Sequence, residues 1–124
     1  MSFEFYGAKI AYEKLLSLGA PTAQAEAVME AIIRHQDLGE TGTITELGQI
    51  IQLATVFDNV GMNPDLITKD LIESVTSKWK RNGWSGCFAS TIREEIGLKP
   101  YCHTTAIDNF AEKVEGNSLM QPYE

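Results

Sequence analysis

The stretch "AEAVMEAIIRHQDLGETGTITELGQIIQLATVFDNVG", residues 25–61, decides the fold of this chain. Its apolar residues recur at spacings of three and four, which is typical of the buried face of an amphipathic helix. This predicts one helix over about 21–36 and another that ends at Gly61. Thr43 and Glu46 match the capping box that opens a helix. The apolar positions are Ala25, Val28, Met29, Ile32 and Ile33 in the first helix, and Leu47, Ile50, Ile51, Leu53, Ala54 and Phe57 in the second.

The rest of the chain has the same helical character. An N-terminal helix is expected to end at Gly19, and Thr68 is placed to cap a fourth helix. A fifth is predicted over roughly 86–96 and a short one near 107–114, followed by an irregular tail. No window alternates polar and apolar residues for the length of a strand. We therefore predict an all-α fold of about five to six helices, forming a single domain over residues 1–124.

The composition narrows the class of protein. The chain has 124 residues, a net charge of −7 and 44% hydrophobic residues, which suits one globular domain without affinity for nucleic acid. It shows no membrane span and no secretory signal. Lys78, Lys80 and Arg81 are interpreted as a solvated helix end. Cys87 and Cys102 form no CxxC pair, so we interpret them as reduced thiols of a cytoplasmic protein.

His35 and Asp37 stand where the second predicted helix gives way to glycines. One interpretation is structural: a histidine near a helix C-terminus interacts favourably with the helix dipole, and Asp37 can hydrogen-bond its ring. The other is a pocket residue whose tautomer is fixed by Asp37 or by the "GETGT" loop. Both interpretations remain open on the residues alone.

Asp58 follows Ala54 and Ile51 at helical spacing, so it is expected on the apolar face of its helix. A carboxylate there needs an ion pair, hydrogen bonds or a metal. In a simple antiparallel hairpin of the two helices, His35 and Asp58 would lie on the order of 20 Å apart. Two ligands are also too few for a metal site. His103 is expected to be structural, as are the aromatic residues Trp79, Trp84 and Phe88.

Three long segments resemble the C-terminal half of fungal cyanamide hydratases, which are HD-domain proteins. They are "SFEFYGAKIAYEKL" at residues 2–15, the stretch at 25–61, and "WSGCFASTIREEIGLKPYCHTTA" at 84–106. The resemblance covers nearly the whole chain. It implies a partial HD-domain helical bundle and the hydration of cyanamide to urea.

The resemblance also implies a divalent metal, with zinc as the expected ion. The metal is held by a histidine, an adjacent His-Asp doublet and a distant aspartate. Asp58 matches that aspartate, and His35 resembles a pocket histidine with a catalytic role. Asp37 and Asn59 are expected to bind substrate. The first histidine and the doublet are expected upstream of "SFEFYG", outside this chain.

Three hypotheses follow. The first is a truncated or split lyase, inactive alone, that needs a complementing N-terminal fragment. The second is a non-catalytic helical interaction module derived from the HD-domain fold. The third is a homodimer that assembles another metal site from His35, Asp37, Asp58 and His103. Apolar faces that the missing helices would cover are expected to favour association.

Overall fold

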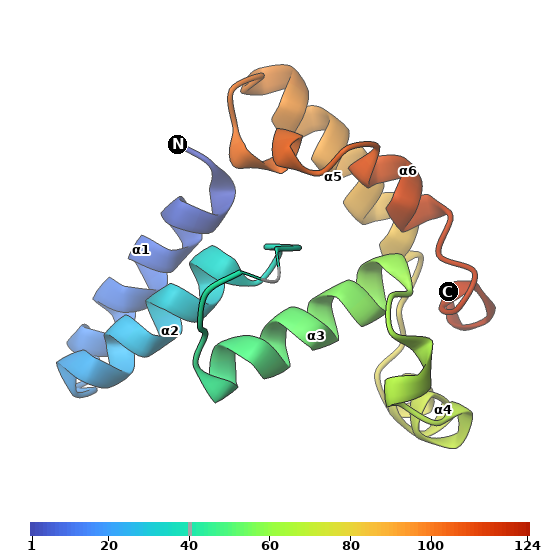
Figure 1. The fold of residues 1–124 in the computed structure, drawn as a ribbon, viewed down its shortest axis with the longest axis horizontal. Helices are drawn as coiled ribbons and strands as arrows, with labels where there is room; N and C mark the ends of the chain where they lie inside the picture. Colours follow the sequence, from blue (N-terminus) through green and yellow to red (C-terminus); the bar gives the residue numbers. More distant parts are fainter. Residues whose placement is uncertain (40) are drawn as a thin grey trace. The chain divides into compact units, whose positions relative to one another are not determined.

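The computed structural model describes residues 1–39 and 41–124, and within them the fold is all-α, as predicted. The described residues form six α-helices and three short 3-10 helices and contain no strand (Figure 1). The α-helices are α1 (Phe3–Ser17), α2 (Thr22–Arg34), α3 (Glu46–Val60), α4 (Lys69–Lys78), α5 (Trp84–Leu98) and α6 (Phe110–Glu115). The 3-10 helices are η1 (Pro64–Leu66), η2 (His103–Ala106) and η3 (Gln121–Tyr123).

The chain divides into two compact units, Met1–Thr55 and Val56–Glu124, and the boundary falls within α3. The expected organisation of residues 1–124 as a single HD-type domain stays a prediction. None of the helices in the described residues is long and apolar enough to cross a membrane.

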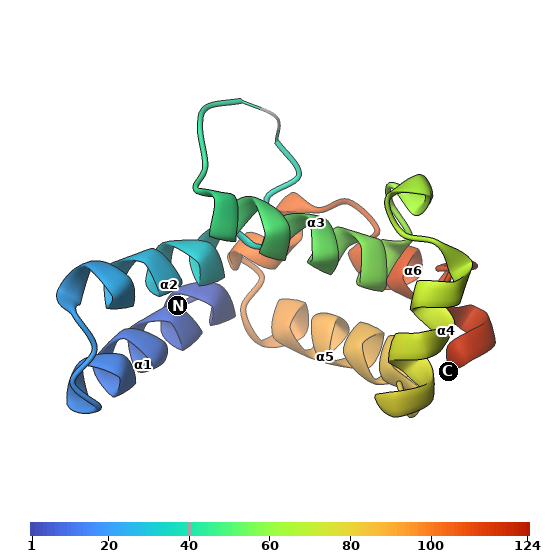
Figure 2. The same ribbon diagram turned by 90° about the horizontal axis from the view of Figure 1, so that it is seen from below.

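In the first unit, α1 and α2 lie side by side as a helical hairpin (Figures 1 and 2). Gly19 ends the first arm, as predicted, with a positive φ of 83° that suits glycine. The amide of Ala20 donates to the carbonyl of Leu15, and that of Gly19 to Leu16, so the last carbonyls of α1 are satisfied. The buried residues of the two helices include the small side chains Ala8, Ala25 and Ala31, which permit close packing.

The start of α3 corrects the predicted capping box. The helix begins at Glu46, and the hydroxyl of Thr45 accepts a hydrogen bond from the amide of Gly48 at 3.1 Å. Thr45 is therefore the capping residue, and Glu46 is the first helical residue rather than the third. Thr43 instead offers its backbone carbonyl to Arg34 at 2.9 Å.

In the second unit, two clusters of buried side chains hold the helices together. Thr68 caps α4 as predicted, its hydroxyl accepting from the amide of Leu71. The tail after α6, expected to be irregular, forms η3 and places Met120 in the core, 3% exposed. The larger cluster joins α5 and α6 through Ala89, Ile92, Phe110, Ala111 and Val114, and the other comprises Phe57, Ile72 and Met120.

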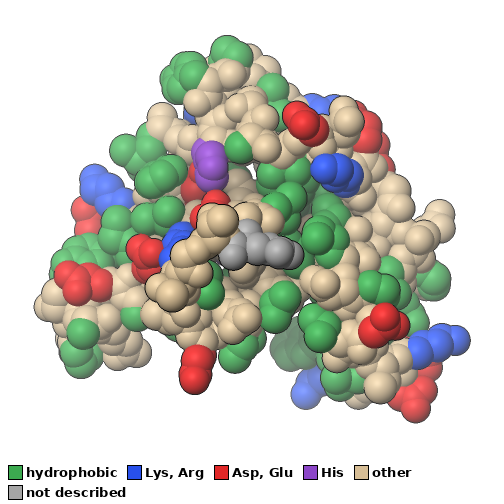
Figure 3. Space-filling model, in the orientation of Figure 1, with side chains coloured by type: hydrophobic (Ala, Val, Ile, Leu, Met, Phe, Trp, Pro, Cys, Tyr) green, Lys and Arg blue, Asp and Glu red, His purple; other side chains and the backbone are tan. Residues whose placement is uncertain are grey.

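Part of the predicted apolar face of α3 is open to solvent. Leu47 is exposed and Ile50 is 66% exposed, although both belong to the predicted stripe. Hydrophobic side chains are visible across the face drawn in Figure 3. Helical periodicity identified which residues share a face, but it does not say whether a neighbouring element covers that face.

Candidate functional site

His35 is the C-terminal cap of α2, the place where the sequence predicted a histidine at a helix end. Its ring Nδ1 hydrogen-bonds the carbonyl oxygen of Ile32. A carbonyl can only accept, so Nδ1 carries the proton and Nε2 is the acceptor in the neutral ring. The ring of Phe3 meets the imidazole edge-on, with 5.9 Å between the centroids. The tautomer is thus set by the backbone carbonyl of Ile32 rather than by Asp37. The alternative "GETGT" loop includes residue 40, which lies outside the described residues.

Asp37 lies just after α2, and its contacts are with Arg34 and Gln52 rather than with the ring of His35. Its carboxylate Oδ2 is 3.8 Å from Nε of Arg34, and its amide donates to the Arg34 carbonyl at 3.0 Å. The side-chain amide of Gln52 donates to the carbonyl of Asp37 and so connects this loop to α3. The substrate-binding role expected of Asp37 stays a prediction.

Asp58 lies near the end of α3, where its side chain is 45% exposed and paired with Arg81, whose own side chain is only 6% exposed. The guanidinium NH1 donates to Oδ1 of Asp58. The expectation that Asp58 belongs to the buried face therefore holds only in part. The salt-bridge alternative left open by the sequence describes the contact that the structure shows.

Arg81 was missed by the sequence reasoning, which placed it in a solvated run of basic residues. Its Nε donates to Oε1 of Glu124 at 2.9 Å, and its NH2 donates to the hydroxyl of Ser85 at 3.2 Å. Ser85 in turn donates to Glu124 at 2.6 Å. One buried cation thus joins two carboxylates and a hydroxyl.

The network changes the proton affinity of its members. Burial alone would lower the pKa of Arg81, but its hydrogen bonds to Asp58 and Glu124 outweigh this and raise that pKa. Burial likewise opposes the shift at Glu124, where hydrogen bonds from Ser85 and Arg81 lower the pKa of the carboxyl. Arg81 and Glu124 therefore both stay charged at neutral pH.

The backbone next to Asp58 is also held from the C-terminal segment. Nδ2 of Asn117 donates to the carbonyl of Asp58 at 2.8 Å, and its Oδ1 accepts from the amide of Met120 at 3.3 Å. Asn59 accepts a hydrogen bond from the indole Nε1 of Trp84 at 2.7 Å. These long-range contacts fix the end of α3, and no local sequence pattern marks them.

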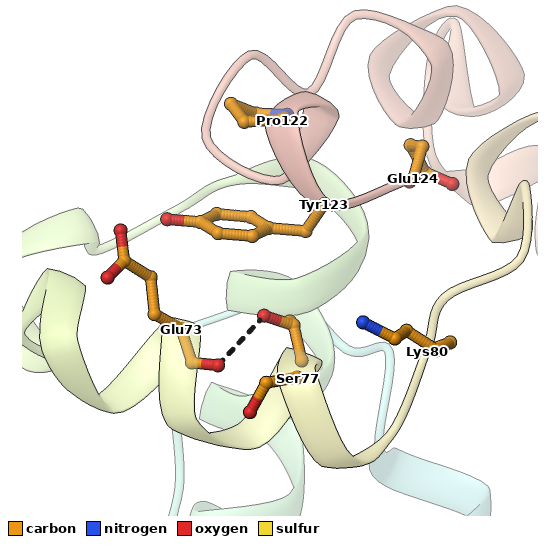
Figure 4. A pocket seen from close by; sticks show the side chains of 7 residues that line it. Glu73, Ser77, Lys80, Pro122, Tyr123 and Glu124 are labelled. Carbon is orange, nitrogen blue, oxygen red and sulfur yellow. Dashed lines mark hydrogen bonds between the residues drawn. The ribbon is translucent and has the colours of Figure 1, made fainter.

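A cavity of about 370 Å³ lies between α4 and the C-terminal residues (Figure 4). In Figure 4 the ring of Tyr123 lies across it, with Glu73 on one side and Lys80 on the other. Glu124 lines this cavity, which connects it to the Arg81 network. None of the four candidate site residues lines it. The described residues that line it are Glu73, Thr76, Ser77, Lys80, Pro122, Tyr123 and Glu124.

The candidate metal-binding side chains of the described residues do not by themselves form a metal site. Within residues 1–39 and 41–124, no group of three or more His, Cys, Asp and Glu side chains is placed to hold an ion. Protein metal sites use three or four such ligands, and Oδ1 of Asp58 is already bonded to Arg81. The described residues therefore do not fit a complete metal centre.

Comparison with known proteins identifies two similar yeast enzymes. No protein-family profile matches the chain. Cyanamide hydratases DDI2 and DDI3 of Saccharomyces cerevisiae are each 45% identical to it over 121 residues. The match covers 96% of this chain and 54% of each yeast protein, so the chain spans about half the length of these relatives. The predicted resemblance to a fungal cyanamide hydratase is confirmed.

Proposed function

We propose that this chain, which is homologous to part of the fungal cyanamide hydratases, forms about half of a metal-dependent hydro-lyase. The reaction adds water to the nitrile carbon of cyanamide and gives urea. The oxygen of water bonds to carbon, and its two protons pass to nitrogen. The identity of 45% across almost the entire chain carries this proposal.

The proposed cofactor is a divalent metal ion, with zinc expected. Such an ion would polarise the nitrile of the substrate and lower the pKa of the attacking water. Asp58 is the proposed ligand from this chain, within a partial HD-type bundle. Its half-exposed carboxylate supports that role, because the hydrogen bond from Arg81 goes to one of its two oxygens, Oδ1.

The roles proposed for His35, Asp37 and Asn59 follow from the resemblance. His35 is proposed to contact substrate or solvent through Nε2, since Nδ1 is bonded to Ile32. Asp37 and Asn59 are proposed to bind substrate. The indole of Trp84 would orient the amide of Asn59, whose Oδ1 it already holds.

We further propose that the 124 residues alone are inactive. The chain has two histidines, His35 and His103, and neither stands next to an aspartate. The remaining metal ligands must then come from another polypeptide segment or from a second copy of the chain. The first hypothesis, a split or partial enzyme, is the one that the identity to the yeast enzymes favours.

A second candidate function is a non-catalytic helical interaction module. The observation that favours it is the exposure of large apolar side chains, including Ile50 at 66% and Trp79 at 68%. The two functions differ in one measurable respect. Only the lyase hypothesis predicts urea production once the missing ligands are supplied.

The test is a chimera in which this chain replaces the matching segment of the yeast enzyme DDI2. Purified chimera, loaded with zinc, is given cyanamide, and urea is measured over time. Zinc-dependent urea formation supports the proposal, and the isolated 124-residue chain under the same conditions should form none. A folded chimera that makes no urea would leave the interaction module as the better account.

A further inference from the structure

Gln36 is a buried residue whose side-chain amide lacks a hydrogen-bond partner. It is 4% exposed, and neither its Oε1 nor its Nε2 has a partner among the described residues. A buried amide without partners costs free energy, so such groups normally bond to protein, water or ligand. Gln36 stands between His35 and Asp37, two of the candidate site residues.

Other polar side chains gather at the same place. Residues 35 and 36 follow α2, at the end of the hairpin where α1 begins (Figures 1 and 2). The contact between the rings of Phe3 and His35 fixes this juxtaposition. Glu4, the next residue along α1, is completely buried. The open end of the hairpin therefore holds two buried polar residues, Glu4 and Gln36, beside the half-buried His35, and fully buried polar residues of this kind are uncommon.

We propose that the amide of Gln36 binds the small neutral substrate or product at the open end of the α1–α2 hairpin. This inference rests on the proposed function and deepens it. A primary amide presents a donor and an acceptor side by side. Urea has the matching acceptor and donor, and cyanamide offers an amino donor and a nitrile nitrogen. Molecules of three or four heavy atoms need little more room than one or two waters.

The first test uses stability. Gln36→Met keeps the length of the side chain and removes both unpartnered polar atoms in favour of a single methyl group, which should stabilise the free chain. We expect the midpoint of thermal unfolding to rise by roughly 2–5 °C. Gln24→Met, at an exposed position in the first turn of α2, is the matched control and should leave it unchanged. A fall in the midpoint for Gln36→Met would show that the amide supports the fold, and would overturn the inference.

The second test uses binding to the unmodified 124-residue chain. The side-chain NH₂ resonance of Gln36 is followed in the ¹⁵N-labelled chain as cyanamide, and separately urea, is added. So small a ligand binds no tighter than about millimolar, so the titration runs to about 50 mM. We expect a saturating shift at Gln36 and none at Gln24. The absence of any shift at Gln36 with both compounds would contradict the inference.

These outcomes separate the inference from the proposed function. If the chimera hydrates cyanamide and Gln36→Met leaves its KM unchanged, the inference fails and the function stands. If the chain binds cyanamide or urea at Gln36 and the chimera forms no urea, the inference stands and the function fails. An increase in KM with little change in kcat for Gln36→Met in the chimera would support both.

Discussion

Arg81 and Asp58 form an ion pair in which the cation is buried and the carboxylate is half exposed. Replacing Arg81 with methionine preserves most of the packing of its aliphatic stem and removes the charge. Asp58 and Glu124 would then lose their common partner but could still be hydrated. We expect the free energy of unfolding to fall by about 1–3 kcal/mol in chemical denaturation. Lys80→Met, in the same basic run but exposed, is the control and should change it little.

The side-chain carboxylate of Glu124 is expected to make the stability of the folded chain depend on pH. The pKa of Glu124 is lowered in the folded state, since hydrogen bonds from Ser85 and Arg81 outweigh burial. A lowered folded pKa stabilises the protein above the ordinary pKa of a glutamic acid, and this contribution is lost as the pH falls through the lower, folded value. Glu124→Gln should therefore flatten the acid limb of a plot of unfolding free energy against pH. An unchanged acid limb would exclude Glu124 as its source.

The end of α3 is predicted to tolerate no side chain at Gly61. This residue has a φ of 71°, and an added Cβ would lie 2.6 Å from Oδ1 of Asn117, the residue that holds the Asp58 carbonyl. Gly61→Ala should destabilise the protein by about 2–4 kcal/mol, combining backbone strain with overpacking.

Gly83 provides the matched control for this prediction. Its φ is 73°, but a Cβ there would meet nothing within 4 Å. Gly83→Ala should therefore cost only the backbone term, about 1–2 kcal/mol. Equal losses for the two variants in thermal or chemical unfolding would show that Asn117 does not crowd Gly61.

The corrected cap of α3 gives a further pair of variants. Thr45→Ala removes the hydroxyl that accepts from Gly48 and should cost about 1 kcal/mol. Thr43→Ala leaves the backbone carbonyl that binds Arg34 in place and should stay within about 0.5 kcal/mol of the parent. A larger loss of stability for Thr43→Ala than for Thr45→Ala would instead support the capping box expected from the sequence.

These residues show how far sequence reasoning reaches. Local rules predicted the all-α class, the end of α1 at Gly19 and the cap at Thr68, because each depends on residues a few positions apart. The same rules selected Thr43 as the cap of α3 because Glu46 stands three residues after it, and this prediction is wrong, since the hydroxyl of Thr45 caps the helix. Which threonine caps α3 depends on tertiary contacts before the helix. Arg34 donates a hydrogen bond to the carbonyl of Thr43, and Gln52 donates one to the carbonyl of Asp37.

The candidate site was less accessible from sequence. Asp58 could be singled out as a carboxylate on an apolar helix, but its partner Arg81 is 23 residues away and was assigned to a solvated run. Asn117 and Glu124 contact residues that are even farther away in the sequence, and no local sequence pattern indicates these contacts. Such partners are selected by tertiary packing. The burial of Gln36, between two residues already singled out, was likewise invisible to periodicity.

The central claim is that Asp58 contributes a metal ligand to a cyanamide-hydrating site, and the metal content of the chimera tests it most directly. Purified chimera and its Asp58→Asn variant are dialysed against zinc and then buffer, and bound zinc is measured by mass spectrometry. Asp65→Asn, an exposed aspartate after α3, is the control. We predict close to one zinc per chimera and per control chain, and a loss of at least about tenfold in zinc affinity for Asp58→Asn, with urea production lost in parallel. Undiminished zinc and undiminished urea production in the Asp58→Asn chimera would contradict the account.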